Sequence, residues 1–367
     1  GGAPPVPEGA ERASAAAPEV DEASGAALSS LAPVLSEAAL LTHVRALTDE
    51  ALAGRQAGSE GERAAARYVA QVLEGAGVAG MPRAGRYHDF DSSQGWEPAA
   101  SPRSRTALGW LPGADPALAG ELVVVGAHLD HLGVRGGVIH PGADDDASGV
   151  AVVLEVARAL SARRGELGRP VIFAFFGAEE IGLVGARAFV GEKAPRATAP
   201  AQPALVDPAN VAVMVNVDMV GRTLLDVVGA AMAMRLLGID HEQSLGVVGM
   251  ATRPAMRAAA ERAFAAEGLA LVGTEDLPGF LRGLVEQQSN GRADSFAFER
   301  AGVPTLFFTN GVHADYHQPS DTVDRLRGDL MAKRARALAE LVVALSKLPS
   351  AELPRSTGSP FAVKKGP

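Results

Sequence analysis

The chain has 367 residues, of which 47% are hydrophobic and 21% are charged, a composition typical of a globular protein with a large buried core. Its formal net charge of −9 and its lack of a basic run argue against a nucleic-acid-binding surface. It has no cysteine, which excludes disulfides, thiolate catalysis and cysteine-ligated metal sites. Any metal must therefore be held by His, Asp or Glu. No apolar stretch approaches the length of about eighteen residues that spans a bilayer.

Composition also predicts how the chain is divided. Residues 1–26 are rich in Ala, Pro, Gly, Ser and Glu and are expected to form a flexible tail, as are residues 351–367. Residues 27–350 are expected to form one domain. The chain does not begin with a signal peptide, although a chain whose signal has been removed would look the same as a trimmed sequence. We expect a secreted, periplasmic or envelope-associated location, and the sequence does not predict the oligomeric state.

Between the tails, apolar runs alternate with amphipathic segments. The apolar runs are continuous, as in strands covered on both faces, and they span residues 121–128, 171–177, 210–218 and 304–310. Helices are predicted over residues 35–51, 60–75, 148–163, 182–190, 255–267, 295–300 and 329–347. This alternation predicts an α/β fold, a three-layer sandwich whose mixed, mostly parallel central sheet is covered by helices on both faces.

Acidic and imidazole side chains follow each of the four predicted strands. They are, in chain order, His128 and Asp130, Glu179 and Glu180, Asp218, and His317. Because ligands of open α/β sheets bind at the carboxyl ends of the strands, these groups are expected to meet at one edge. The run Asp144-Asp145-Asp146 adds three carboxylates, whereas capping of a helix accounts well for only one. Together the groups predict a metal site.

The spacing of these residues suggests individual roles. In an extended segment, residues i and i+2 point to the same side, so Asp130 is expected to reach the far ring nitrogen of His128. By the same rule His131 is expected to point to the opposite face, away from the site. Glu179 and Glu180 are adjacent and project differently, so one can bind metal while the other faces the attacking water. Such ligands, without thiolate, suit hydrolytic zinc, with Co²⁺ or Mn²⁺ as possible substitutes.

Five motifs occur in an order that resembles the M28 family of zinc aminopeptidases, which are co-catalytic two-zinc exopeptidases. They are GAHLDH, PGADDDASG, FGAEEIGLVGA, VNVDM and YHQPSDT, and the resemblance extends from Leu35 to Leu348. It implies that residues 27–350 form a metallopeptidase catalytic domain. It also implies that the chain hydrolyses the N-terminal bond of peptides with a free N-terminus, with acidic groups near the metals holding the α-ammonium group.

The resemblance further assigns residues to the two zinc ions. The implied ligands are His128 and Asp218 on one ion, Glu180 and His317 on the other, and Asp145 bridging both. Glu179 is the implied general base, and Asp130 is the implied partner that orients His128. Many relatives carry Asp-His where this chain has Asp294-Ser295, so contacts with the substrate or with the zinc–water network are expected to differ while metal binding is retained.

Other functions remain open at this point. They are another M28-type hydrolase (carboxypeptidase-like), a glutaminyl cyclase, and a binding-only relative. Cyclases use one zinc and binding-only relatives lose ligands, so the full ligand set counts against both. A dizinc hydrolase of the M20 type would need an inserted dimerisation domain and a different motif order. The sequence does not predict the side-chain preference, although residues 222–250 and 275–294 are expected to build the pocket.

Overall fold

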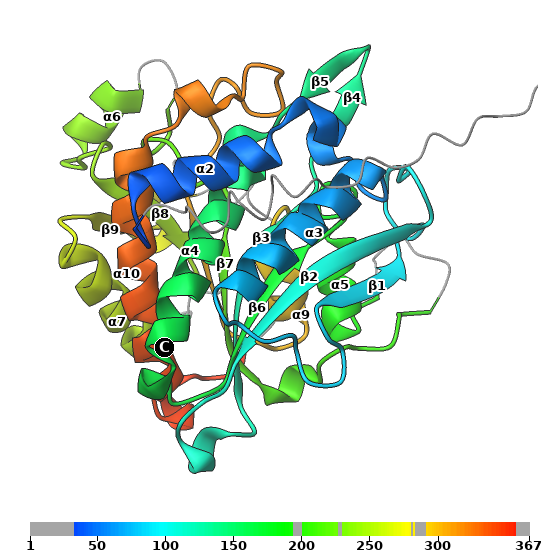
Figure 1. Cartoon of the computed structure of the whole chain (residues 1–367). Coiled ribbons are helices and arrows are strands. Elements are labelled where there is room, and N and C mark those ends of the chain that lie inside the picture. Colours follow the sequence, from blue (N-terminus) through cyan, green and yellow to red (C-terminus); the bar gives the residue numbers. More distant parts are fainter. Residues whose placement is uncertain (1–32, 194–199, 227–229, 280–281, 283–290, 357–367) are drawn as a thin grey trace, which may run out of the picture. The chain divides into compact units, whose positions relative to one another are not determined.

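The computed structural model describes residues 33–193, 200–226, 230–279, 282 and 291–356 (Figure 1). All of these belong to one compact unit, residues 32–367. The predicted N-terminal tail and residues 357–367 lie outside the described residues. Within the described ranges, no helix is both long and apolar enough to cross a lipid bilayer.

The centre of the fold is an eight-stranded sheet in the order β1-β2-β6-β3-β7-β10-β8-β9. Its strands are β1 (Tyr87–Asp91), β2 (Arg103–Leu111), β3 (Leu122–His128), β6 (Val171–Phe176), β7 (Val211–Val217), β8 (Ser244–Val248), β9 (Ala270–Gly273) and β10 (Thr305–Thr309). The four neighbouring strands β6, β3, β7 and β10 are parallel and match the four predicted apolar runs. β1, β2 and β8 pair antiparallel with their inner neighbours. β4 (Gly133–Arg135) and β5 (Val138–His140) form a separate hairpin.

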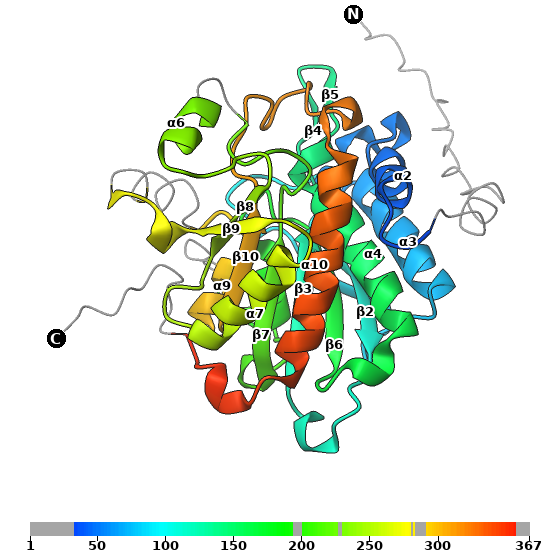
Figure 2. The same ribbon diagram turned by 90° about the vertical axis from the view of Figure 1, so that its left-hand side faces the viewer.

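Helices cover both faces of this sheet, which confirms the predicted fold class (Figures 1 and 2). They are α2 (Glu37–Leu47), α3 (Glu60–Gly75), α4 (Gly149–Ala162), α5 (Val184–Val190), α6 (Ala230–Leu236), α7 (Pro254–Ala265), α9 (Ser295–Arg300) and α10 (Gly328–Lys347). α3, α4, α7 and α10 lie on one face, with α2 packed on α4 and α10, and α5 and α9 lie on the other. The predicted helix at 35–51 ends at Leu47, and a separate 3₁₀ segment, Glu50–Arg55, begins after the cap Asp49.

The central strands are apolar throughout because both of their faces are buried. On the α5 and α9 face, the rings of Phe176, Phe189 and Phe298 pack together with centroids 5.7–5.9 Å apart. On the other face, Phe264 of α7 stacks on Phe308 of β10 at 5.2 Å. Burial of this kind contributes about 25 cal/mol per Å² of apolar surface, so it holds the strand ends in place.

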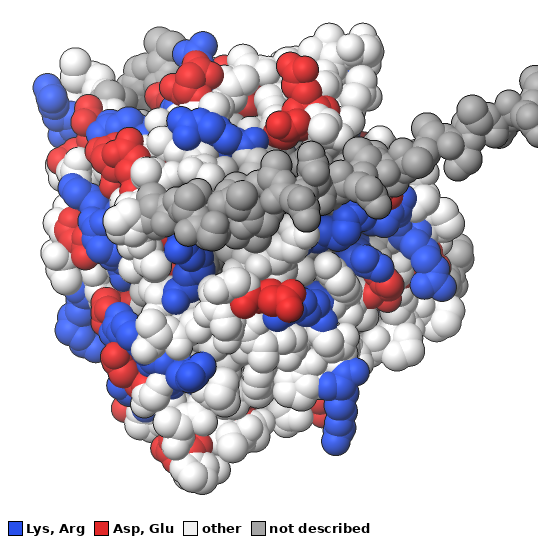
Figure 3. Space-filling view, viewed as in Figure 1, with Lys and Arg blue, Asp and Glu red and all other residues white. Residues whose placement is uncertain are grey.

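The surface and the C-terminal segment complete the unit. Both signs of charge are interspersed on the face of Figure 3. In the first turns of α3, Glu60 accepts from Arg63 at 3.0 Å and from Arg67 at 2.7 Å. The described part of the predicted C-terminal tail, residues 351–356, is packed on the domain. Leu353 is buried, and Arg355 donates hydrogen bonds to main-chain carbonyls of the segment that leads into β7.

Candidate metal centre

The predicted site residues lie where the central strands end. His128 is the last residue of β3, Glu179 and Glu180 follow β6, and Asp218 follows β7. His317 lies in the loop after β10. Because these four strands are parallel, their carboxyl ends share one edge of the sheet, and the structure brings the predicted side chains together there.

Two groups of ligand atoms share the carboxylate of Asp145. His128 Nε2 lies 3.0 Å from Asp145 Oδ1 and 3.6 Å from Asp218 Oδ1. On the other side, His317 Nε2 lies 3.2 Å from Asp145 Oδ2 and 3.2 Å from Glu180 Oε2. The five predicted ligands therefore surround two neighbouring positions, and Asp145 presents one oxygen to each.

These atoms fit a pair of metal ions. Asp145 Oδ2, Glu180 Oε1, Asp218 Oδ1 and His317 Nε2 are buried and have no hydrogen-bond partner. Burying polar groups without a partner is costly, and a cation at each position would satisfy them. Ligand atoms around a tetrahedral zinc ion with bonds of about 2.0 Å lie about 3.3 Å apart. The four separations above scatter around that value.

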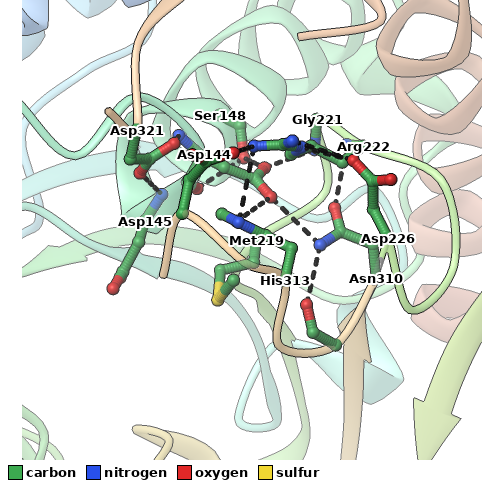
Figure 4. Close-up of polar contacts among 12 residues, drawn as sticks. Asp144, Asp145, Ser148, Met219, Gly221, Arg222, Asp226, Asn310, His313 and Asp321 are labelled. Atoms are coloured by element: carbon green, nitrogen blue, oxygen red, sulfur yellow. Dashed lines mark hydrogen bonds and ion pairs between the residues drawn. The ribbon is translucent and has the colours of Figure 1, made fainter. Parts of the chain in front are cut away.

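The three consecutive aspartates have different partners, and Figure 4 shows those of Asp144 and Asp145. Asp144 accepts hydrogen bonds from the main-chain nitrogen of Gly221 at 2.7 Å and from the side chain of Asn310 at 3.0 Å. Asp321 accepts from the main-chain nitrogens of Asp144 at 3.0 Å and Asp145 at 3.1 Å. These contacts hold the turn so that Asp145 faces the metal positions. The sequence analysis did not identify Asn310 and Asp321, because both support the aspartate turn through hydrogen bonds with residues that are distant in the sequence.

Asp146 ties two strand ends together. Its carboxylate accepts from the main-chain nitrogen of His128 at 3.1 Å and from that of Met219 at 3.0 Å. A third hydrogen bond comes from the main-chain nitrogen of Gly149, the first residue of α4, at 3.0 Å. Burial, reinforced by the charge of Asp218, raises the pKa of Asp146 well above its usual range. Asp146 is therefore a structural group, and Asp145 alone of the three faces both metal positions.

Asp130 contacts His128, the residue it was expected to orient, but not through its carboxylate. Its carboxylate accepts from the main-chain nitrogens of Glu179 at 2.9 Å and Glu180 at 3.3 Å. The far nitrogen of His128, Nδ1, instead lies 3.0 Å from the main-chain carbonyl oxygen of Asp130. The alternation of an extended strand does not continue past His128, where β3 ends, so the predicted carboxylate–imidazole contact is replaced by a carbonyl contact.

The environments of Glu179 and Glu180 push their pKa values apart. Burial, together with the charges of Asp294, Glu180 and Asp218, raises the pKa of Glu179 well above its usual range. Burial acts in the same direction on Glu180, yet contacts with two imidazoles bring its pKa down to about 2. Adjacent carboxyls with opposite shifts are typical of an acid–base group beside a permanently ionised ligand.

His131 does not point away from the site, so that prediction was wrong. Its Nδ1 atom lies 2.8 Å from Glu180 Oε1 and 3.7 Å from Asp145 Oδ2, and its side chain is fully buried. The chain has left β3 by this point, and the nitrogen of His131 donates to the carbonyl of Arg55 at 3.1 Å. The second imidazole of the HLDH motif was the available signal, because it follows the predicted ligand His128 in a loop.

Arg55 holds the loops that carry these ligands. Its buried guanidinium donates to the main-chain carbonyls of Leu47 at 2.6 Å and Leu129 at 2.9 Å. It also donates to the carbonyls of Pro141 at 2.8 Å and Gly142 at 3.0 Å. One side chain thus joins the end of α2, the segment after β3 and the turn before Asp145. Sequence reasoning missed Arg55 because it lies outside every motif.

A pocket opens beside the metal positions. Among its lining residues are the predicted ligands His128, Asp145, Glu180 and Asp218, together with Glu179. Most of the remaining lining side chains are apolar: Met219, Leu224, Leu225, Met234, Val247, Val248, Val272, Leu277, Phe307 and Val312. Several come from the ranges 222–250 and 275–294, parts of which lie outside the described residues. The pocket therefore presents a polar, acidic end and an apolar end.

Asp294 and Ser295, at which different contacts with the substrate or the zinc–water network were expected, lie at the start of α9. Both carboxylate oxygens of Asp294 and the hydroxyl of Ser295 are buried without a hydrogen-bond partner. Burial and the charges of Asp130 and Asp218 raise the pKa of Asp294 well above its usual range. Neither residue belongs to the two groups of candidate metal ligands.

Comparisons with known proteins agree with this arrangement. Leucine aminopeptidase 1 of Uncinocarpus reesii is 40% identical over 83 residues, which is 21% of this chain and 21% of that protein. The match thus spans about a fifth of that curated relative. The zinc aminopeptidase BSAP of Bacillus subtilis superposes with a TM-score of 0.59 at 15% identity, covering 87% of this chain and 98% of that one. Glutaminyl cyclase of Porphyromonas gingivalis superposes with a TM-score of 0.58 at 17% identity, covering 84% and 98%.

The two structural likenesses concern the fold alone. The family comparison is more specific, because the sequence profile described as peptidase family M28 matches residues 108–342. That range contains the five candidate ligands, Asp130 and Glu179. The chain belongs to peptidase family M28.

Proposed function

We propose that this protein is a zinc-dependent aminopeptidase that hydrolyses the N-terminal bond of peptides with a free N-terminus. The observation that carries the proposal is the pair of ligand groups sharing Asp145, set beside Glu179 at the acidic end of the pocket. Membership of a peptidase family supports hydrolysis of a peptide bond. The partial likeness to leucine aminopeptidase 1 supports action at the amino end.

The chain's residues divide the work between binding and proton transfer. His128, Asp145 and Asp218 would hold one zinc ion, and Asp145, Glu180 and His317 the other. When bound, zinc would supply a Lewis acid and would lower the pKa of a coordinated water molecule. Glu179 accepts a proton from the attacking water and passes it to the leaving amine, a role that suits its raised pKa.

The two ends of the pocket support a preference for the substrate's first residue. The negative charge of the carboxylates at the acidic end favours a free α-ammonium group, which an acetylated terminus lacks. The apolar end, with side chains such as Leu224, Val247 and Phe307, favours a bulky apolar first side chain. Two metal positions, as opposed to one, support a hydrolase over a glutaminyl cyclase on the same fold.

The decisive experiment compares one peptide with a free N-terminus and its N-acetylated twin, using protein loaded with zinc. We expect release of the first residue from the free peptide only, faster for Leu or Phe than for Asp, and loss of activity with a chelator. Glu179→Gln is the matched inactive control. Comparable cleavage of both peptides, or release from the carboxyl end, would refute the aminopeptidase assignment. Ring closure of an N-terminal glutamine without hydrolysis would indicate a cyclase.

A further inference from the structure

The imidazole of His131 has no role in the proposed five-ligand centre, yet it lies within it. Its Nδ1 atom is 2.8 Å from Glu180 Oε1 and 3.7 Å from Asp145 Oδ2. The ring meets that of His317 edge-on, with centroids 5.8 Å apart. Its side chain has no exposed surface, and neither ring nitrogen has a hydrogen-bond partner. A buried imidazole with two unpaired nitrogens is costly unless something else satisfies it.

The contact with Glu180 has the geometry of two ligands of one ion. Nδ1 of His131 and Oε1 of Glu180 are close enough to hydrogen-bond, but they are not aligned to do so, and both atoms remain unpartnered. Atoms that bind the same metal approach one another in this way, because their lone pairs converge on the ion and not on each other. His131, Asp145 and Glu180 in fact form one of the two candidate metal groups in the described ranges.

Contacts with Arg55 and Gly142 fix the backbone and the ring of His131 in this orientation. The main-chain nitrogen of His131 donates to the carbonyl of Arg55 at 3.1 Å. The ring also packs on Gly142, where a Cβ atom would come within 2.5 Å of the Cγ atom of His131. Gly142 has a φ of +59°, so glycine is favoured there on both counts. The position of His131 is thus built into the same turn that presents Asp145.

We propose that His131 is a sixth protein ligand of the centre, binding through Nδ1 the metal ion that Asp145, Glu180 and His317 hold. This assignment rests on the proposed two-metal function. It makes the two metal positions unequal. This position has four protein ligands, two of which are imidazoles, whereas the position at His128 and Asp218 has three protein ligands. The position with four ligands resembles a closed structural site, and the other keeps an open place for water or substrate.

The test uses His131→Asn and His131→Ala in the full chain. Asparagine places an amide close to the position of Nδ1, so it can donate a hydrogen bond to Glu180 but is a poor zinc ligand. We expect both variants to lose affinity for the more tightly held zinc, by at least about 10-fold in competition with a chelator. X-ray absorption of the zinc-loaded protein should count three imidazoles for two zinc ions, and two in His131→Asn. His88→Gln, on the edge strand β1, is the matched control and should leave both readings unchanged.

Two results would overturn the assignment. One is an imidazole count of two in the unaltered protein. The other is wild-type zinc affinity in His131→Asn with a loss in His131→Ala, which would mean that His131 only orients Glu180 by a hydrogen bond. Neither the zinc affinity nor the imidazole count is measured with a peptide substrate. Failure of the His131 assignment can therefore be told apart from failure of the proposed function. A protein that binds two zinc ions with three imidazoles but releases no N-terminal residue would refute the aminopeptidase assignment and leave that of His131 standing.

Discussion

Asp130 Oδ1 accepts a hydrogen bond from the main-chain nitrogen of Glu179 at 2.9 Å, so a side chain just beyond β3 holds the turn that follows β6. The other oxygen of the same carboxylate accepts from Glu180 at 3.3 Å. The proposed base and one proposed ligand are therefore placed by a single group. The main-chain carbonyl of Asp130 also contacts the ring of His128, so the positions of three proposed functional side chains depend on the segment around Asp130.

Replacing Asp130 by Asn should impair both proton transfer by Glu179 and zinc binding by Glu180, because Asp130 holds the turn that carries these two residues. An amide offers one acceptor for two N–H donors and turns an NH₂ group toward the second, so the turn must shift. We expect kcat to fall at least about 10-fold, with weaker zinc binding. Steady-state kinetics and zinc analysis measure the two effects. Asp115→Asn is a matched control, because Asp115 accepts from the nitrogen of Ala117 in a distant cap that Asn also serves. Unchanged kinetics in Asp130→Asn would contradict the positioning role.

Glu179→Gln and Asp145→Asn should fail in different ways. Glu179 is assigned to proton transfer, so its amide should keep two zinc ions and lose turnover by at least about 100-fold. Asp145 presents an oxygen to each metal position, so its amide should also lose zinc. Zinc content and kcat, measured on the same samples, separate the two outcomes. Loss of zinc from Glu179→Gln, with both ions kept in Glu180→Gln, would mean that the two glutamates have exchanged roles.

Removal of metal should destabilise the fold. Without cations, the buried carboxylates of Asp145 and Asp218 and the largely buried carboxylate of Glu180 lie close together, and an unpaired buried charge is costly. Metal that binds only the folded state adds stability in proportion to the logarithm of its free concentration over Kd, about 2.7 kcal/mol at a hundred times Kd. We expect the Tm to fall on chelation and to recover on addition of zinc. A Tm independent of zinc would contradict tight binding at these positions.

The stability of the fold should also depend on pH through Glu62 of α3. Burial and the nearby charge of Asp130 raise the pKa of Glu62 to about 8, although Ser104 and two main-chain nitrogens donate hydrogen bonds to it. A carboxyl whose pKa is higher in the folded state favours folding while protonated. Its contribution is complete below the ordinary pKa of 4.5 and is lost as the pH rises to about 8.

Glu62→Gln should remove this dependence, because the amide stays neutral. Between about pH 5 and about pH 8, the free energy of unfolding from urea titration should fall less steeply in the variant, with a difference in slope of at most about 1.4 kcal/mol per pH unit. Glu60→Gln, an exposed change in the first turn of the same helix, is the control. Its pKa is lowered by Arg67 and Arg63, so it cannot produce a slope of this sign. Equal slopes in Glu62→Gln and the unaltered chain would refute the prediction.

The central strands could be predicted from sequence because burial on both faces makes them continuously apolar. The outer strands could not. β1 reads Tyr-His-Asp-Phe-Asp, and only Phe90 in it is buried, so it has no apolar run. β2 begins with Arg-Ser-Arg-Thr, and β9 has four residues of which only Gly273 is buried. Strands at the margins of a sheet meet solvent, and pairing with a neighbour defines them more than composition does.

The same limit applies to the site. Residues at strand ends were predictable, because parallel strands deliver them to one edge whatever the details of the loops. His131 and the carboxylate of Asp130 were misplaced, because the i, i+2 rule was applied beyond His128, where the extended backbone ends. Contacts made across distant segments, such as Asp321 with the turn at Asp145, leave no local pattern to read.

Arg55 lies more than fifty residues before the part of the chain that the M28 profile matches, residues 108–342. Its hydrogen bonds nevertheless reach Leu129 and Gly142, inside that part. A chain cut at residue 108 would keep every candidate ligand and lose the group that braces their loops. The part of the chain that the profile matches is thus smaller than the part that supports the candidate ligands. A fragment chosen from the profile alone should therefore hold its metals poorly, and a better fragment would begin before α2, whose last residue, Leu47, also accepts a hydrogen bond from Arg55.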